Sequence, residues 1–177
     1  MAFGRRGASR CLRTEPSVYL PTERNTTCMY DHILLASDGT EASTNAESHA
    51  ISLAAEHGAA LHVLYVVDED VYTAYSGDEY VDESEGPEHG LEETGQETLA
   101  RIQADAEASG VDATTTLKHG RPAESVIETA DEADVDLLVL GTKRRPAEYR
   151  SLLGSITDKV LRLSERPAVV VKTEVEE

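Results

Sequence analysis

The sequence contains no tryptophan, a single phenylalanine and only two cysteines among its 177 residues. Both cysteines, Cys11 and Cys28, lie before residue 29, so the rest of the chain has no thiolate for a structural zinc site. A run of about 18 apolar residues, which a membrane-spanning helix needs, is absent. The arginines near the N-terminus are not followed by the apolar segment of a secretory signal. We therefore expect a soluble, cytoplasmic protein with no membrane partner.

Positive charge is also scarce. The chain has 34 Asp and Glu against 16 Lys and Arg, which gives a formal net charge of -18. Such a field repels the phosphates of DNA and RNA, so we expect no nucleic-acid partner. Only four of the basic residues are lysines. This acidic, lysine-poor and aromatic-poor composition is typical of proteins that work in concentrated salt, where screening reduces self-repulsion, and we interpret the protein as halophilic.

Several motifs of enzymes and metal sites are missing as well. The sequence has neither the Gly-x-x-x-x-Gly-Lys-Ser/Thr loop of P-loop NTPases nor the Gly-x-Gly-x-x-Gly loop of dinucleotide enzymes. Nucleophile motifs of the Ser-x-x-Lys and Gly-x-Ser-x-Gly types are absent, and the six histidines show no paired metal-ligand spacing. We therefore predict no catalytic residue and no protein-held metal.

What the sequence does contain is a set of short apolar runs. Residues 32–37, 61–67, 136–141 and 168–172 form nearly continuous runs, a pattern typical of strands buried on both faces of a parallel sheet. Residues 112–119 are β-branched but polar, which fits an edge strand. Segments with helical periodicity separate these runs. The alternation predicts a single-domain α/β fold with a doubly wound, five-stranded parallel sheet.

The first and last helical segments give specific expectations. The first can be capped by Thr40 or Ser43 and ends at Gly58. The last begins near Gly154 and ends before Pro167. Its periodicity predicts a buried apolar face made of Leu153, Ile156, Val160 and Leu161.

Two segments fall outside the pattern of strands and helices. Residues 1–28 hold five arginines and two glutamates, and we interpret them as a disordered extension or a mis-assigned start, with a short regulatory arm as the alternative. The folded domain then comprises residues 29–177. Residues 68–93 contain eleven acidic residues and no Lys or Arg, which predicts an acidic mobile loop. Its tyrosines could cover a bound base, although a solvated, salt-adapted loop explains them as well.

Glycines and hydroxyl side chains follow two of the predicted strands. Ser37-Asp38-Gly39-Thr40 comes after the first strand, Gly141-Thr142 begins the segment after the fourth, and Gly154-Ser155-Ile156-Thr157 opens the last helix. In open α/β sheets ligands bind beyond the carboxyl ends of the strands, and bare N–H groups at a helix start suit phosphate oxygens. Simpler structural roles also fit, because Asp38 can cap a turn and Ser155 and Thr157 can be ordinary helix-start residues.

Three segments and one spacing are recognisable together: HILLASDGTEAS, LLVLGT, ERPAVVVK and the spacing from Gly141 to Gly154-Ser155. They resemble the universal stress protein family, and the resemblance covers residues 30–172. It implies a Rossmann-like fold of the adenine nucleotide alpha hydrolase type, with strand order 3-2-1-4-5. It also implies that a loop from residue 141 to residue 155 binds the phosphates of an adenine nucleotide.

The resemblance assigns candidate site residues one by one. Asp38 corresponds to the acidic residue after the first strand, Val66 would lie under the adenine, and Gly141 and Gly154-Ser155 begin and close the loop. The full set of candidate nucleotide-binding residues is Ala36, Ser37, Asp38, Val66, Leu140, Gly141, Thr142, Arg144, Gly154, Ser155, Ile156 and Thr157. The implied ligand is ATP, with or without Mg²⁺, and no general base for fast hydrolysis is evident from the spacing.

One position departs from the family's loop, which runs Gly, two residues, Gly, nine residues, Gly and then Ser or Thr. Arg144 stands where the middle glycine is expected. An arginine there would block the phosphates if the glycine is needed for close backbone approach. The basic side chains of this loop could instead hold the phosphates, or merely neutralise acidic neighbours; they are Lys143, Arg144, Arg145 and Arg150.

These observations leave function classes open. The first is a homodimeric sensor or regulator of the stress response that binds ATP through residues 141–155, with at most slow hydrolysis. The second is a dimeric interaction module whose pocket is blocked by Arg144. A nucleotide hydrolase of related fold is a weaker third, because no catalytic set is recognisable. The apolar final strand, residues 168–172, lies at a sheet edge by the family's strand order, and its resemblance to the family's dimer contact implies a homodimer.

Overall fold

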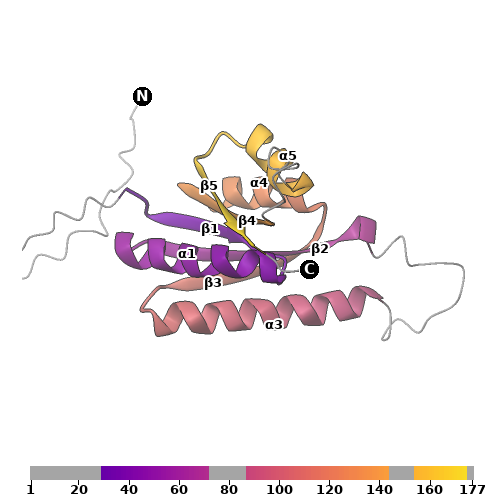
Figure 1. Ribbon diagram of the computed structural model, residues 1–177, viewed down its shortest axis with the longest axis horizontal. Helices are drawn as coiled ribbons and strands as arrows, with labels where there is room; N and C mark the ends of the chain where they lie inside the picture. Colours follow the sequence, from indigo (N-terminus) through magenta and orange to yellow (C-terminus); the bar gives the residue numbers. More distant parts are fainter. Residues whose placement is uncertain (1–28, 72–86, 144–153, 175–177) are drawn as a thin grey trace, which may run out of the picture.

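The computed structural model describes residues 29–71, 87–143 and 154–174. Within these residues, strands and helices alternate along the chain, and the five strands form one parallel sheet (Figure 1). The elements are β1 (His32–Ala36), α1 (Glu41–His57), β2 (Ala60–Asp68), α3 (Pro87–Ala108), β3 (Ala113–Gly120), α4 (Pro122–Glu132), β4 (Leu137–Lys143), α5 (Ser155–Leu163) and β5 (Ala168–Thr173). The sheet order β3-β2-β1-β4-β5 confirms the predicted fold class and strand order.

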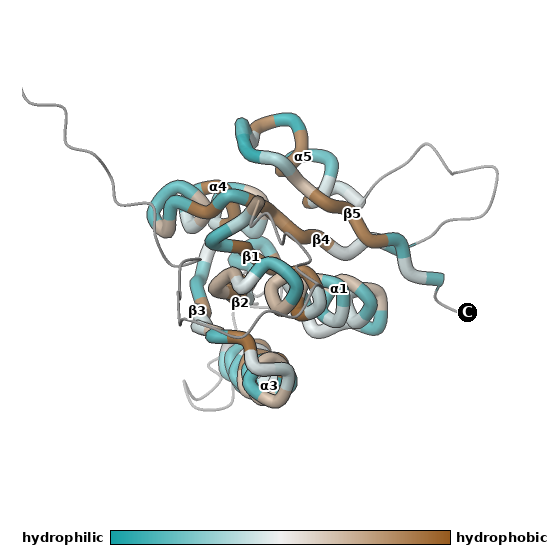
Figure 2. Tube along the Cα trace, turned by 90° about the vertical axis from the view of Figure 1, so that its left-hand side faces the viewer, coloured by the Kyte–Doolittle hydropathy of each residue, from teal (hydrophilic) through white to brown (hydrophobic). Residues whose placement is uncertain are grey.

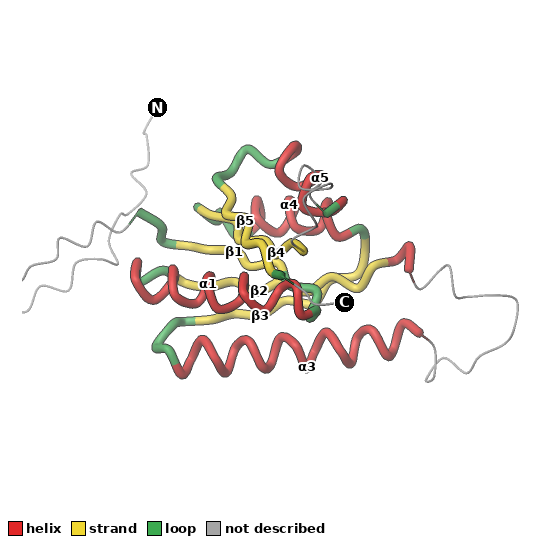
Figure 3. The backbone as a smooth tube through the Cα atoms, viewed as in Figure 1, coloured by secondary structure: helices red, strands yellow, loops and turns green. Residues whose placement is uncertain are grey.

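Helices cover both faces of the sheet (Figures 1 and 3). α1 and α3 pack on one face, where Ile33 and Leu35 of β1 lie in a core cluster with residues of both helices. α4 and α5 pack on the other face, over Leu34. Consecutive residues of a strand point to opposite faces, so a strand covered on both sides is apolar at every position. This explains the nearly continuous apolar runs, which appear in brown along β4 and β5 in Figure 2.

The inner face of α1 consists mainly of small residues, which lets the helix pack close to the sheet. Three of these residues are fully buried: Ala46, Ala50 and Ala54. The helix ends at Gly58, as predicted, and the φ of 64° at this residue is the left-handed conformation that favours glycine. The predicted caps are only partly right. Thr40 occupies the N-cap position without a side-chain cap hydrogen bond, and Ser43 lies inside the helix, where its hydroxyl donates to Thr40 O at 2.8 Å.

The predicted acidic loop, residues 68–93, is wrong at both ends. β2 continues through Asp68, residues 69–71 are helical, and α3 begins at Pro87. Proline is favoured at the first position of a helix and acidic residues are stabilising near a helix N-terminus, so the end of this acidic segment suits the start of α3. The centre of the segment, residues 72–86 with their three tyrosines, lies outside the described residues, as do residues 1–28.

The predicted buried face of the last helix is also wrong in part. Ile156 is 42% exposed and Leu161 is 37% exposed, whereas Thr157 and Val160 are buried. α5 spans only nine residues and contacts α4 and β4, so only a narrow stripe of it meets the core. Leu153 lies outside the described residues.

Candidate functional site

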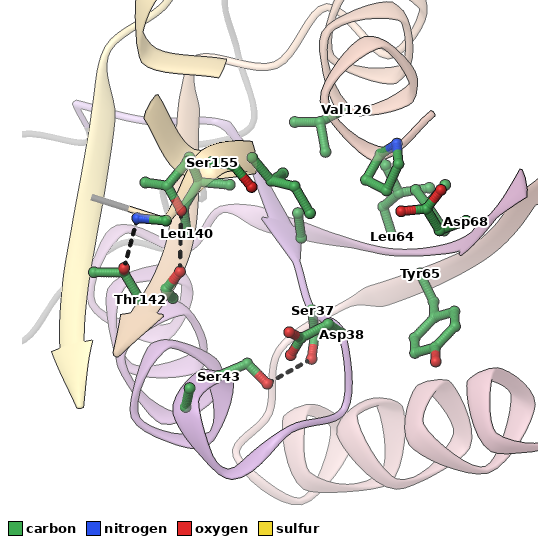
Figure 4. A pocket seen from close by; sticks show the side chains of 18 of the residues that line it. Ser37, Asp38, Ser43, Leu64, Tyr65, Asp68, Val126, Leu140, Thr142 and Ser155 are labelled. Atoms are coloured by element: carbon green, nitrogen blue, oxygen red, sulfur yellow. Dashed lines mark hydrogen bonds between the residues drawn. The ribbon is translucent and has the colours of Figure 1, made fainter. Parts of the chain in front are cut away.

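A cavity of about 390 Å³ lies at the carboxyl ends of β1, β2 and β4. Here the strand order reverses, because β2 lies on one side of β1 and β4 on the other. Open α/β sheets bind ligands at such points. Figure 4 shows the side chains that surround this space, which come from the ends of the strands and from the helices.

The cavity brings together the candidate residues that the sequence indicated. Eleven of the twelve line it: Ala36, Ser37, Asp38, Val66, Leu140, Gly141, Thr142, Gly154, Ser155, Ile156 and Thr157. The twelfth, Arg144, lies outside the described residues, together with Arg145 and Arg150, so a pocket blocked by Arg144 stays a prediction. Lys143, the last residue of β4, also lines the cavity.

The start of α5 is hydrogen-bonded to the end of β4. The Gly154 N–H donates to Thr142 Oγ1 at 3.4 Å, and the Thr157 hydroxyl donates to Gly141 O at 3.3 Å. The N–H groups in the first turn of a helix lack acceptors within the helix and carry the positive end of its dipole. Since Ser155 and Thr157 line the cavity, this turn offers hydrogen-bond donors to an anion there.

Gly141 allows β4 to pass very close to α1. A Cβ atom at this position would lie 2.9 Å from Ser43 Cα and 3.1 Å from Ala42 O, which are both backbone atoms. A side chain therefore fits only if the backbone moves, and glycine is the residue that permits such an approach. Because they lie so close together, the end of β4 and the start of α1 form one continuous wall of the cavity.

Asp38 stands in a tight turn between β1 and α1. Its Oδ1 accepts hydrogen bonds from the Thr40 N–H at 3.0 Å and from the Thr40 hydroxyl at 2.7 Å. Gly39 has a φ of +70°, and a Cβ atom there would lie 2.7 Å from Thr98 Oγ1 of α3. The turn thus rests against α3. Asp38 fills the structural role of a turn residue while it also lines the cavity.

Tyr65 on β2 lies within the electrostatic influence of Asp38. Burial is the larger cause and the negative charge of Asp38 the smaller one, and together they raise the pKa of the Tyr65 hydroxyl above its ordinary value. At neutral pH the hydroxyl therefore keeps its proton. Tyr65 lines the cavity, while its side chain belongs to the core cluster on the face of the sheet that α1 and α3 cover.

A buried carboxylate lies beneath the Asp38 turn. The Glu47 side chain is only 4% exposed, and its Oε2 lies 2.9 Å from Arg101 Nη2 of α3. Its Oε1 accepts a hydrogen bond from the Ser37 hydroxyl at 2.7 Å and lies 3.3 Å from Ser43 Oγ. Ser37 Oγ in turn accepts the Gly39 N–H at 3.2 Å. These contacts, which we call the Glu47 network, connect the cavity wall to α3.

Sequence reasoning missed Glu47 although a signal was present. Glu47 follows Ala46 and lies three residues before Ala50, so it borders the apolar face of α1. A charged residue beside the apolar face of a helix indicates a buried, paired carboxylate, because such groups are rarely buried without partners. Sequence reasoning also missed cavity residues that carry no motif: Leu64, Tyr65, Asp68, Pro122 and Val126.

Metal-ligating side chains do not cluster in the described part of the chain, where no group of three or more His, Cys, Asp or Glu could hold an ion. None of the helices in residues 29–71, 87–143 and 154–174 combines the length and apolar character needed to cross a bilayer.

The sequence profile described as "Universal stress protein family" matches residues 29–172. The chain belongs to the universal stress protein family. Universal stress protein MJ0531 of Methanocaldococcus jannaschii is 34% identical to it over 152 residues, which cover 84% of this chain and 86% of the relative. Universal stress protein YxiE of Bacillus subtilis is 33% identical over 153 residues, which cover 81% of this chain and 100% of the relative. The family predicted from sequence segments and spacing is confirmed.

Solved structures resemble this universal stress protein in fold. The structure of MJ0577 gives a TM-score of 0.65 at 22% identity and covers 84% of this chain and 99% of that one. A universal stress protein in complex with cAMP gives 0.56 at 23% identity, with 81% and 97% covered. The Archaeoglobus fulgidus universal stress protein in complex with dAMP gives 0.56 at 19% identity, with 80% and 97% covered. At these identities the likeness concerns the fold.

Proposed function

We propose that this universal stress protein binds an adenine nucleotide in the cavity and works as a sensor or regulator rather than as a fast enzyme. The observation that carries the proposal is that the two ends of the cavity differ in chemical character. The first turn of α5 and Thr142 lie at one end, whereas Leu64 and Asp68 lie at the other (Figure 4). The relatives in complex with cAMP and dAMP support an adenine nucleotide as the occupant.

Under this proposal the phosphates of the nucleotide lie at the start of α5. The N–H groups of the first turn and the Ser155 hydroxyl donate to the phosphate oxygens, and Lys143 adds a positive charge. Asp38 lies between the two ends of the cavity in Figure 4, where its carboxylate can accept hydrogen bonds from ribose hydroxyls. ATP, with or without Mg²⁺, is the ligand that we expect.

Calorimetric titration at high salt tests the proposal. We expect ATP, AMP and cAMP to bind with measurable heat at a single saturable site in each chain. The Arg144→Gly variant is titrated beside the wild type, because Arg144 stands where the family's loop has glycine. If only the variant binds, the alternative of an interaction module with a blocked pocket is supported. If neither protein binds any of the three nucleotides, the nucleotide proposal is wrong.

The same proposal includes a homodimer formed through residues 168–172 of β5. β5 is an edge strand, and residues 168–171 are only partly buried. The neighbouring helix α5 exposes Leu161 and Leu163. An apolar strand edge with unpaired backbone groups favours pairing with a second strand, and a two-fold axis would close the assembly as a dimer.

The Val170→Lys variant should be monomeric by light scattering, because it places a charge in the middle of the proposed contact. The wild type should scatter as a dimer. Thr114→Lys is the matched control, since Thr114 is an exposed residue on the opposite edge strand β3 and its replacement should leave the mass unchanged. A dimeric mass for Val170→Lys would remove the β5 contact from consideration.

A further inference from the structure

Asp68 is a carboxylate at the end of the cavity opposite the start of α5. It is the last residue of β2, and it lines the cavity. Side chains alternate along a strand, so Leu64, Val66 and Asp68 point to the same face of the sheet, which is the face that α4 covers. Figure 4 shows Asp68 and Leu64 at the end of the cavity away from Thr142.

The neighbours of Asp68 in the cavity are apolar. Leu64 and Val66 come from β2, Pro122 and Val126 come from the start of α4, and all four line the same space. Apolar side chains of this kind suit the faces of a planar base. A base held among them would present one polar edge to the carboxylate at the end of the strand.

The Asp68 carboxylate is held in place by the backbone that follows it. Its Oδ1 accepts the Asp70 N–H at 3.0 Å. Each carboxylate oxygen has two lone pairs, so the group keeps acceptor capacity for a ligand. An ionised carboxylate has no hydrogen to donate. It therefore attracts an amino group and repels a carbonyl oxygen.

We propose that Asp68 selects the base of the nucleotide by accepting a hydrogen bond from an exocyclic amino group. The inference rests on the proposed nucleotide function and adds the residue that sets the choice of base. Adenine carries an amino group at C6, whereas hypoxanthine carries an oxygen at that position. AMP and inosine 5′-monophosphate (IMP) share the ribose and the phosphate, so their relative affinity reports on the edge of the base alone.

Calorimetric titration of the full chain with AMP and IMP measures this selectivity. We expect the wild type to bind AMP about tenfold more tightly than IMP, because one hydrogen bond to a charged group is replaced by repulsion. In Asp68→Asn the two affinities should become similar, because the amide can donate to the hypoxanthine oxygen. Asp70→Asn is the matched control: Asp70 is exposed, and the variant loses one charge but keeps the N–H that Asp68 accepts. Its ratio should equal that of the wild type.

A second test changes the ligand and keeps the wild-type protein. It uses purine riboside 5′-monophosphate, which lacks the amino group. It should bind roughly tenfold more weakly than AMP. Equal affinity for these two nucleotides, or an unchanged AMP-to-IMP ratio in Asp68→Asn, would show that Asp68 does not select the base. If AMP binds without selectivity, only this inference is wrong. If no nucleotide binds, the proposed function is wrong as well.

Discussion

Replacing Glu47 with alanine should lower the free energy of unfolding by about 2–3 kcal/mol. The substitution removes the acceptor of the Ser37 hydroxyl and leaves Arg101 of α3 without its closest carboxylate. Arg101 is 48% exposed, so water can solvate the freed guanidinium, and the loss should stay below that of a fully buried ion pair. Urea denaturation measures the change.

Two matched variants separate the Glu47 network from the general effect of removing a glutamate. Glu47→Gln keeps the shape and an acceptor oxygen, and should lose only about 1 kcal/mol. Glu97→Ala removes an exposed glutamate from α3 and should change stability by less than about 0.5 kcal/mol. If Glu47→Ala is no less stable than Glu97→Ala, the network makes no contribution to stability.

The Gly141→Ala variant should lose about 1–3 kcal/mol of stability and most of its nucleotide affinity. The new methyl group would meet backbone atoms of Ser43 and Ala42, which cannot rotate away as the end of a side chain can. β4 must then move away from α1. The start of α5 is hydrogen-bonded to the end of β4, so it should move as well. Urea denaturation and calorimetric titration with AMP report the two effects.

Gly90→Ala provides the control for this variant. A Cβ atom at Gly90, in α3, would meet nothing within 4 Å. Alanine is favoured over glycine inside a helix by about 0.5–1 kcal/mol, so this variant should be at least as stable as the wild type. If Gly141→Ala matches Gly90→Ala in stability and in AMP binding, the close passage of β4 along α1 is not required for the site.

The strands could be predicted from the sequence because the sheet is covered on both faces. Leu34 and Leu35 point to opposite faces and are both fully buried, so their run is apolar at every position. The place of the cavity was also predictable. In a parallel sheet all carboxyl ends meet at one edge, which brings Ser37 after β1 close to Gly141 in β4.

α5 shows that helical periodicity does not determine which residues of a helix are buried. The four-residue spacing of Ile156 and Val160 indicates one side of a helix, but it carries no information on how much of that side the rest of the protein covers: Val160 is buried and Ile156 is exposed. The same limit applies to Pro122 and Val126. They line the cavity only because α4 packs against β2 on one face of the sheet. The local sequence pattern of α4 does not reveal this packing.

α3 is connected to the Asp38 turn directly through Thr98 and indirectly through Glu47 of α1, which accepts a hydrogen bond from Ser37. Thr98 contacts Gly39, and Arg101 pairs with Glu47. A nucleotide that holds the Asp38 turn would therefore oppose the local opening of α3, and the opening of α3 would weaken the hold on the nucleotide. Linked equilibria of this kind are reciprocal, so each would shift the other by the same factor. Through these two contacts, part of the free energy of nucleotide binding would stabilise α3 against local opening.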